Sequence, residues 1–282
     1  MTRHLITQLG RLALAALVLP LATSADAAPT VFTDAGDDAA DIQATVDAFR
    51  DALGALNAPA PVQNTGGRRQ IDWDAAPDAV SAPNAFPGDF FNFSAAPRAR
   101  GIEFTTPGSG FFLSATDASG VGIEFDNIDP SYSDTFDTFS PERLFTPYES
   151  VITIAKFFSP ADQTTPATTR GFGAVFSDVD YTDVSRIDYF DENDNLLTTV
   201  YAPAAGGDET LSFAGAVYDE AIISSVWIYS GNTPLAPGVT DDPSNGVDLV
   251  VLDDFIFGEP VPEPTAFGLV ALALGAFGVR RR

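Results

Sequence analysis

The feature that most limits the possible folds is a series of short β-type runs between residues 101 and 257. Val, Ile, Phe, Tyr and Thr dominate the runs, whereas Asp, Asn, Gly and Pro dominate the gaps, as in strands joined by turns. No repeat of fixed period is visible, which argues against a propeller or solenoid. The runs predict a mainly β fold, an antiparallel jelly-roll-like β-sandwich over residues 68–258. The expected strands are Gly101–Thr105, Gly110–Ala115, Arg143–Thr146, Val151–Phe158, Gly171–Ser177, Ser185–Phe190, Leu197–Tyr201, Glu209–Phe213, Ile222–Tyr229 and Val247–Phe257.

One amphipathic helix is expected before the strands, at residues 38–56, within an N-terminal segment that spans residues 28–67. Its apolar side chains recur at spacings of three and four residues and so share one stripe: Ile42, Val46, Phe49, Leu53 and Leu56. Asp34 or Asp37 can cap its N-terminus. The stripe fits a helix that binds a partner or one packed across the end of the domain, and we favour the packed helix. After it, residues 75–100 contain a Phe-rich stretch and are expected to form a long ordered loop.

Both ends of the chain carry patterns typical of export. Residues 1–27 read as a signal peptide, with Arg3 and Arg11, an apolar run, and Ala25-Asp26-Ala27 as the cleavage site. Residues 259–282 contain Pro262, Glu263 and Pro264, an uncharged apolar run at 266–279, and then Arg280, Arg281 and Arg282. A helix over that run would reach roughly 21 Å, less than the ~30 Å core of a bilayer. A buried core helix is the alternative, but the run lacks the polar face that such a helix shows. We expect a short membrane helix with its arginines on the cytoplasmic side.

The C-terminal pattern resembles the PEP-CTERM sorting signal of Gram-negative bacteria that make extracellular polysaccharide. The resemblance rests on the order of Pro262-Glu263-Pro264, the apolar run and the three terminal arginines. It implies recognition by the membrane enzyme exosortase, cleavage near the triplet, and export to the cell surface or extracellular matrix. The expected partners are therefore the Sec translocon and exosortase, with only a transient stay of the C-terminal helix in the inner membrane.

The central region also shows a resemblance, carried by residues 171–180, 187–197 and 250–257. These stretches resemble a recurrent pattern in uncharacterised secreted bacterial proteins. The closing motif Leu252-Asp253-Asp254-Phe255-Ile256 is similar to the last strand of many carbohydrate-binding jelly rolls. The resemblance implies a jelly-roll fold but no particular activity.

Composition excludes several classes of function. The formal net charge is −25; without residues 1–27 and the residues after Pro264, 38 acidic residues face 9 basic ones, a charge near −29. Such a surface repels nucleic acid and anionic lipid, so neither is expected as a partner. The chain has no cysteine, its single histidine is His4 in the expected signal peptide, and its single lysine is Lys156. Triad, imidazole, zinc and Schiff-base chemistry are therefore unsupported in the exported part.

Buried carboxylates are the best candidates for a metal site. Strand alternation places either Asp253 or Asp254 on an apolar face, where a cation, an arginine or backbone N–H groups must meet its charge. In the jelly rolls that this region resembles, the last and first strands often share a structural calcium ion. That resemblance adds Asp72 or Asp74 as ligands for Ca²⁺, which prefers oxygen. The alternative is a hydrogen-bonded aspartate at a bulge. Residues 191–195 also carry alternating oxygen side chains, but they lack the pattern of an EF-hand and are expected to form a hairpin turn.

Trp227 and Tyr229 are candidates for stacking on sugar rings. They share one face of an expected strand, with Val226 and Ile228 on the other. The aromatic pair is exposed if the aliphatic pair faces the core, and buried if both faces are covered. The sequence thus predicts a non-catalytic, exported acidic surface or matrix protein that binds an extracellular polysaccharide or a cation, or serves structurally. A carboxylate-based glycosidase or lyase acting on matrix polysaccharide is the alternative.

Overall fold

A computed structural model describes residues 28–262 of the chain. The expected signal peptide, the membrane helix, Glu263, Pro264 and the terminal arginines lie outside these residues, whereas Pro262 lies within them. Across residues 28–262, no helix is long and apolar enough to span a membrane.

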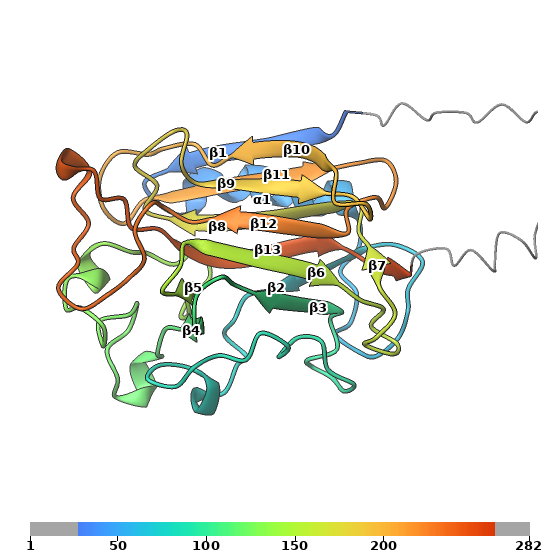
Figure 1. Cartoon of the computed structure of the whole chain (residues 1–282), viewed down its shortest axis with the longest axis horizontal. Coiled ribbons are helices and arrows are strands. Elements are labelled where there is room, and N and C mark those ends of the chain that lie inside the picture. The colour runs from blue at the N-terminus through green and yellow to red at the C-terminus, as the bar shows by residue number, and fades with distance from the viewer. Residues whose placement is uncertain (1–27, 263–282) are drawn as a thin grey trace, which may run out of the picture.

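The fold is mainly β, as expected, and contains one α-helix, α1 (Ala39–Leu53), and four short 3₁₀ helices (Figure 1). The 3₁₀ helices are η1 (Asp78–Val80), η2 (Asp117–Ser119), η3 (Tyr132–Asp134) and η4 (Pro243–Asn245). The strands are β1 (Thr30–Gly36), β2 (Arg68–Ile71), β3 (Ile102–Thr105), β4 (Gly110–Leu113), β5 (Phe145–Tyr148), β6 (Ile152–Phe157), β7 (Ala167–Thr168), β8 (Gly171–Ser177), β9 (Arg186–Phe190), β10 (Leu196–Tyr201), β11 (Leu211–Val217), β12 (Ser225–Tyr229), β13 (Val251–Gly258) and β14 (Val261–Pro262). Each of the ten expected strands overlaps one of them.

Two antiparallel sheets pack face to face. The larger, seven-stranded sheet has the order β1-β11-β8-β13-β5-β4, with β2 also paired to β13. The five-stranded sheet has the order β10-β9-β12-β6-β3, and β14 pairs with β7 beside them. Side chains from both sheets share one core, for example Phe172 and Phe255 from the larger sheet and Ile187 and Val226 from the smaller. A sandwich of antiparallel sheets is thus confirmed, while its jelly-roll type stays a prediction.

The N-terminal segment adds a strand to the sandwich that the sequence did not predict. β1 forms an edge of the larger sheet through antiparallel pairing with β11, from Thr30↔Val217 to Gly36↔Leu211. Asp34, considered above as a helix cap, lies in this strand. The residues before the helix are therefore part of the large sheet.

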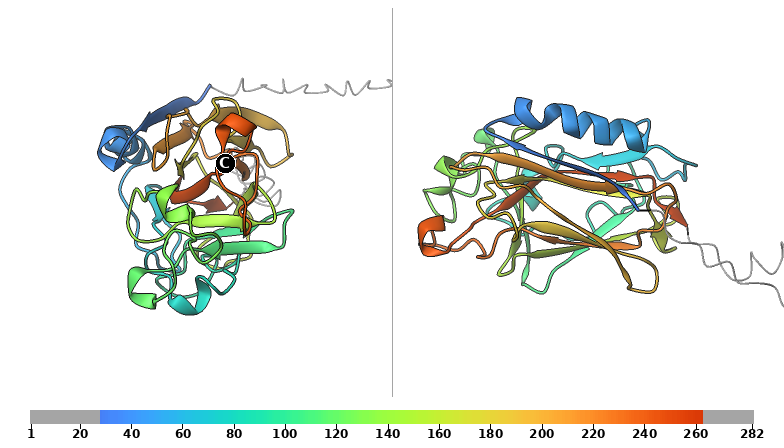
Figure 2. Two further views of the ribbon diagram at one scale, coloured as in Figure 1. Left: turned by 90° about the vertical axis from the view of Figure 1, so that its left-hand side faces the viewer. Right: turned by 90° about the horizontal axis from the view of Figure 1, so that it is seen from above.

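Helix α1 packs on the outer face of the larger sheet (Figure 2). Asp38 caps it by accepting hydrogen bonds from the N–H groups of Ala40 and Asp41, and Gly54 ends it at φ +100°. Four of the five expected stripe residues are buried, but Leu56 follows the end of the helix and is 53% exposed. The helix covers a sheet face rather than the end of the domain.

Two paired glycines make room for the helix. Gly173 of β8 and Gly215 of β11 lie opposite each other in the ladder, and a Cβ on either would lie within about 3 Å of the Phe49 ring. Phe49 also packs edge-on against Phe32 and Phe213. This close approach explains why two glycines are tolerated in central strands.

Trp73 is the centre of the aromatic core. Its ring stacks on Phe145 at 4.4 Å and contacts Phe255 and Phe104, while its indole N–H donates to the Asp253 carbonyl at 2.8 Å. The expected long loop delivers Phe86 and Phe91 to the same cluster. Its aromatic side chains thus explain why this loop is ordered.

Replacing Phe49 by alanine should lower the free energy of unfolding by about 3–5 kcal/mol, because it removes a buried ring and leaves a cavity between α1 and the glycine pair. Denaturant unfolding followed by circular dichroism measures this. Leu56→Ala is the matched control, since that side chain is mostly exposed and should change stability by less than about 0.5 kcal/mol. Equal losses at the two positions would contradict the described end of the helix.

Candidate functional site

Asp253 and Asp254 lie at a bulge in the centre of the larger sheet. The pairing of β13 with β8 shifts register between Leu252 and Phe255, so both carboxylates occupy the irregular part of the ladder, and both are buried. Asp253 accepts hydrogen bonds from the N–H groups of Phe139 at 2.6 Å and Ser140 at 3.0 Å. Burial raises the pKa of Asp253 well above its ordinary value, and the neighbouring Asp254 adds to this.

An arginine and a hydroxyl group meet the second carboxylate. Arg50 donates to Asp254 at 2.9 Å and the Ser140 hydroxyl donates at 2.7 Å. Burial raises the pKa of Asp254 to about 6, although these hydrogen bonds oppose the shift. The aspartates at this bulge are therefore hydrogen-bonded, one of the alternatives that the sequence allowed.

The other two expected metal ligands, Asp74 and Asp72, lie beside other groups of the protein. Asp74 accepts hydrogen bonds from the N–H groups of Glu142 at 2.6 Å and Arg143 at 3.1 Å. Asp72 lines a shallow pocket together with Arg69 and Arg100. Within residues 28–262, these four acids are not among the carboxylates that converge closely enough to share an ion.

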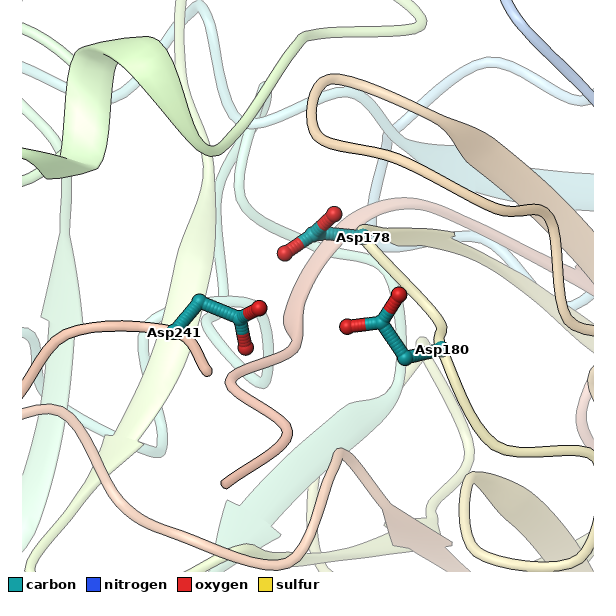
Figure 3. A group of neighbouring side chains, drawn as sticks. All are labelled: Asp178, Asp180 and Asp241. Atoms are coloured by element: carbon teal, nitrogen blue, oxygen red, sulfur yellow. The ribbon is translucent and has the colours of Figure 1, made fainter. Parts of the chain in front are cut away.

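The carboxylates that do converge are Asp178, Asp180 and Asp241, which we call the acidic trio (Figure 3). One oxygen from each lies within 4.8 Å of the others, and the three side chains point toward a common space. Asp178 follows the last residue of β8, and Asp180 comes two residues later. Asp241 lies in the connection between β12 and β13.

Asp178 is the most unusual member of the acidic trio. It is 1% exposed, and neither of its carboxylate oxygens has a hydrogen-bond partner. Its backbone is left-handed at φ +69°, a conformation that costs energy for a residue with a side chain. Burial, then the negative charges of Asp241, Asp180, Asp208 and Asp248, raise its pKa to about 9. A buried carboxylate without a partner is costly unless a cation meets it.

A fourth buried aspartate adjoins the acidic trio. Asp248 is fully buried and accepts a hydrogen bond from the Asp180 N–H at 3.2 Å, while its other oxygen is without a partner. Burial raises the pKa of Asp248 and of Asp241 to about 6, and Asp180 adds its negative charge against Asp241. None of the ion pairs formed within residues 28–262 includes Asp178, Asp180, Asp241 or Asp248. The arrangement is a concentration of negative charge that fits a divalent cation.

The sequence analysis missed the acidic trio because its members come from two distant segments. A signal for it was present, since Asp178-Val179-Asp180 follows an expected strand and Asp241-Asp242 precedes the last one. Antiparallel pairing of those two strands places the end of the first beside the start of the second. By contrast, Asp191 accepts hydrogen bonds from Asn193 and Asn195 in the turn between β9 and β10, so the expected hairpin is confirmed.

Trp227 and Tyr229 lie on the outer face of the smaller sheet. Val226 and Ile228 are fully buried in the core, as one of the two alternatives requires, and both aromatic rings are half-buried. Trp227 packs against Phe190, with the ring centres 5.7 Å apart, and the Arg186 guanidinium lies 3.7 Å from the centre of the Tyr229 ring. The helix α1 covers the other sheet, so within residues 28–262 no α-helix covers this face.

Comparison of the chain with protein-family models, with curated proteins and with solved structures finds no match.

Changing Asp254 to asparagine should lower the free energy of unfolding by about 1–3 kcal/mol, because Arg50 and Ser140 lose a charged acceptor. The same change at Asp178 should raise it in a chelating buffer at neutral pH, because no hydrogen bond is lost and folding no longer requires the protonation of a carboxyl group whose pKa is raised to about 9. Urea unfolding of both variants in EDTA measures the two changes in the free energy of unfolding. A loss of stability in both would show that Asp178 has a partner that the structure does not reveal.

Proposed function

We propose that this chain is an exported, non-catalytic surface or matrix protein that binds Ca²⁺ through Asp178, Asp180 and Asp241. The observation that carries the proposal is the fully buried, unpartnered carboxylate of Asp178. Three converging carboxylates supply hard oxygen ligands, and Asp180 and Asp241 are only half-buried, which gives an ion access from solvent. Ca²⁺ suits such a site better than Mg²⁺, because it accepts more ligands in less regular geometry.

Location is proposed from the ends of the chain and from its charge. The signal-peptide pattern and the resemblance of the C-terminus to an exosortase signal support export to the surface of a Gram-negative bacterium. Extracellular calcium modules bind with dissociation constants of roughly 0.1–1 mM, a range suited to that compartment. The absence of histidine and cysteine from the expected exported part supports a non-catalytic role.

Calcium at 100 times its dissociation constant should stabilise the protein by about 2.7 kcal/mol and raise the melting temperature by roughly 5–10 °C relative to EDTA. Differential scanning calorimetry measures this. Asp178→Asn should abolish most of the rise, whereas Asp183→Asn, the same charge change in the same connection, should retain it. Identical melting temperatures for the unmodified protein in calcium and in EDTA would overturn the calcium proposal.

A second candidate activity is binding of an extracellular polysaccharide at the outer face of the smaller sheet. The observation that favours it is the half-buried pair Trp227 and Tyr229 on the outer face of the sheet, which no α-helix within residues 28–262 covers. Flat aromatic rings in such a position offer an apolar surface for the faces of sugar rings.

A glycan array should show binding that Trp227→Ala weakens by about tenfold, which corresponds to ~1.4 kcal/mol of lost stacking. Phe93→Ala is the matched control, because Phe93 is 43% exposed but lies in the long loop rather than on this sheet. If no glycan on the array is bound, the polysaccharide proposal is wrong, and cation binding or a structural role remains.

A further inference from the structure

The proposed calcium ligands come from two connections that meet at one end of the sandwich. Asp178 and Asp180 belong to the connection between β8 and β9, whereas Asp241 and Asp248 belong to the connection between β12 and β13. The two aspartates of the second connection flank a turn built around η4, and we call residues 240–247 the tip. An ion bound by the acidic trio would therefore link the tip to the end of β8.

The parts of the β12–β13 connection that flank the tip pack against the sandwich through apolar side chains. Leu235 and Leu249 are buried against Phe125, Tyr132 and Phe136. The Tyr132 hydroxyl also bonds to the connection, donating to the carbonyls of Ala236 at 3.1 Å and Val239 at 2.9 Å. These contacts hold the connection on either side of the tip whether or not an ion is present.

Apart from Val247, which packs against the buried cluster around Tyr132, the tip is mostly exposed. Residues 243–246 are exposed, and the Tyr181 hydroxyl donates to the carbonyl of Pro243 at 2.5 Å. The tip's internal hydrogen bonds join Asp242 to Val247 in both directions, and Leu249 N–H donates to the Asp241 carboxylate at 2.8 Å. The tip thus meets the β8–β9 connection through the hydrogen bond from Tyr181 and through the approach of Asp241 to Asp178 and Asp180.

Without an ion, the carboxyl groups of the acidic trio do not all carry a charge at neutral pH. Burial raises the pKa of Asp178 to about 9 and that of Asp241 to about 6, so Asp178 holds a proton. A divalent cation would displace that proton and attract all three carboxylates at once, which joins Asp241 of the tip to the end of β8. The ion would thus add an attachment to an exposed segment, which is the kind of segment that opens locally.

We propose that Ca²⁺ acts as a latch: it closes the tip, residues 240–247, onto the end of β8, and without it the tip opens while the sandwich stays folded. This inference rests on the proposed function, because it takes the acidic trio as the calcium site. It adds that calcium concentration controls the shape of this end of the molecule.

Hydrogen exchange of the full exported chain, followed by mass spectrometry at neutral pH, tests the latch. In EDTA, the amides of Asn245, Val247 and Leu249 should exchange on the order of tenfold faster than in calcium. Amides of β8, β11 and β13 should exchange at the same rate in both buffers. Faster exchange throughout the sandwich in EDTA would overturn the proposal, because the ion would then support the whole fold.

Variants separate binding at the acidic trio from other effects of calcium. The double variant with Asp178→Asn and Asp241→Asn should exchange at the same rate in calcium and in EDTA, because it lacks two of the three proposed ligands. Asp183→Asn should behave as the unmodified chain. A double variant whose tip still becomes protected in calcium would overturn the latch.

Calcium titration calorimetry of the unmodified chain distinguishes failure of the latch from failure of the calcium site. Binding of calcium with no change in tip exchange would overturn the latch and leave the calcium site standing. Absence of any binding would overturn both.

Discussion

The pairing of β8 with β13 is the constraint on which the other features depend. The two strands are neighbours in the larger sheet although more than seventy residues separate them along the chain, and Ser177 lies opposite Val251. This register places Asp178, the next residue, beside the end of the β12–β13 connection. The same ladder contains the bulge that buries Asp253 and Asp254. One set of backbone hydrogen bonds thus positions both groups of buried acids.

The two groups show that burial alone does not distinguish a structural aspartate from a candidate ligand. Asp253 and Asp178 are about equally inaccessible, and burial raises the pKa of both. Around Asp253 the protein supplies two N–H groups, and around its neighbour Asp254 a guanidinium and a hydroxyl group. Around Asp178 it supplies other carboxylates. The neighbours, rather than the depth, distinguish the hydrogen-bonded aspartates from the candidate ligand.

Local pattern was sufficient to predict most elements, and non-local pairing explains what it missed. The strands from Gly171–Ser177 to Val251–Gly258 follow from alternation and turn residues, and the helix follows from the stripe of Ile42, Val46, Phe49 and Leu53. β1 was missed because its place depends on β11, some 180 residues away. The acidic trio was missed for the same reason, since Asp178 and Asp241 are neighbours only through the sheet. The Asp253-Asp254 motif drew the metal prediction because strand alternation puts one of its carboxylates on an apolar face, which is visible from local sequence.

The two ends of the described chain leave the sandwich at one end, and the β12–β13 connection with η4 lies at the opposite end (Figures 1 and 2). β13 runs between these ends, and its eight residues alone span on the order of 25 Å. A molecule held through its C-terminus would therefore direct its chain exits toward the point of attachment. Its acidic end would project outward, where it would be the first part to meet ions and polymers diffusing in from the surroundings.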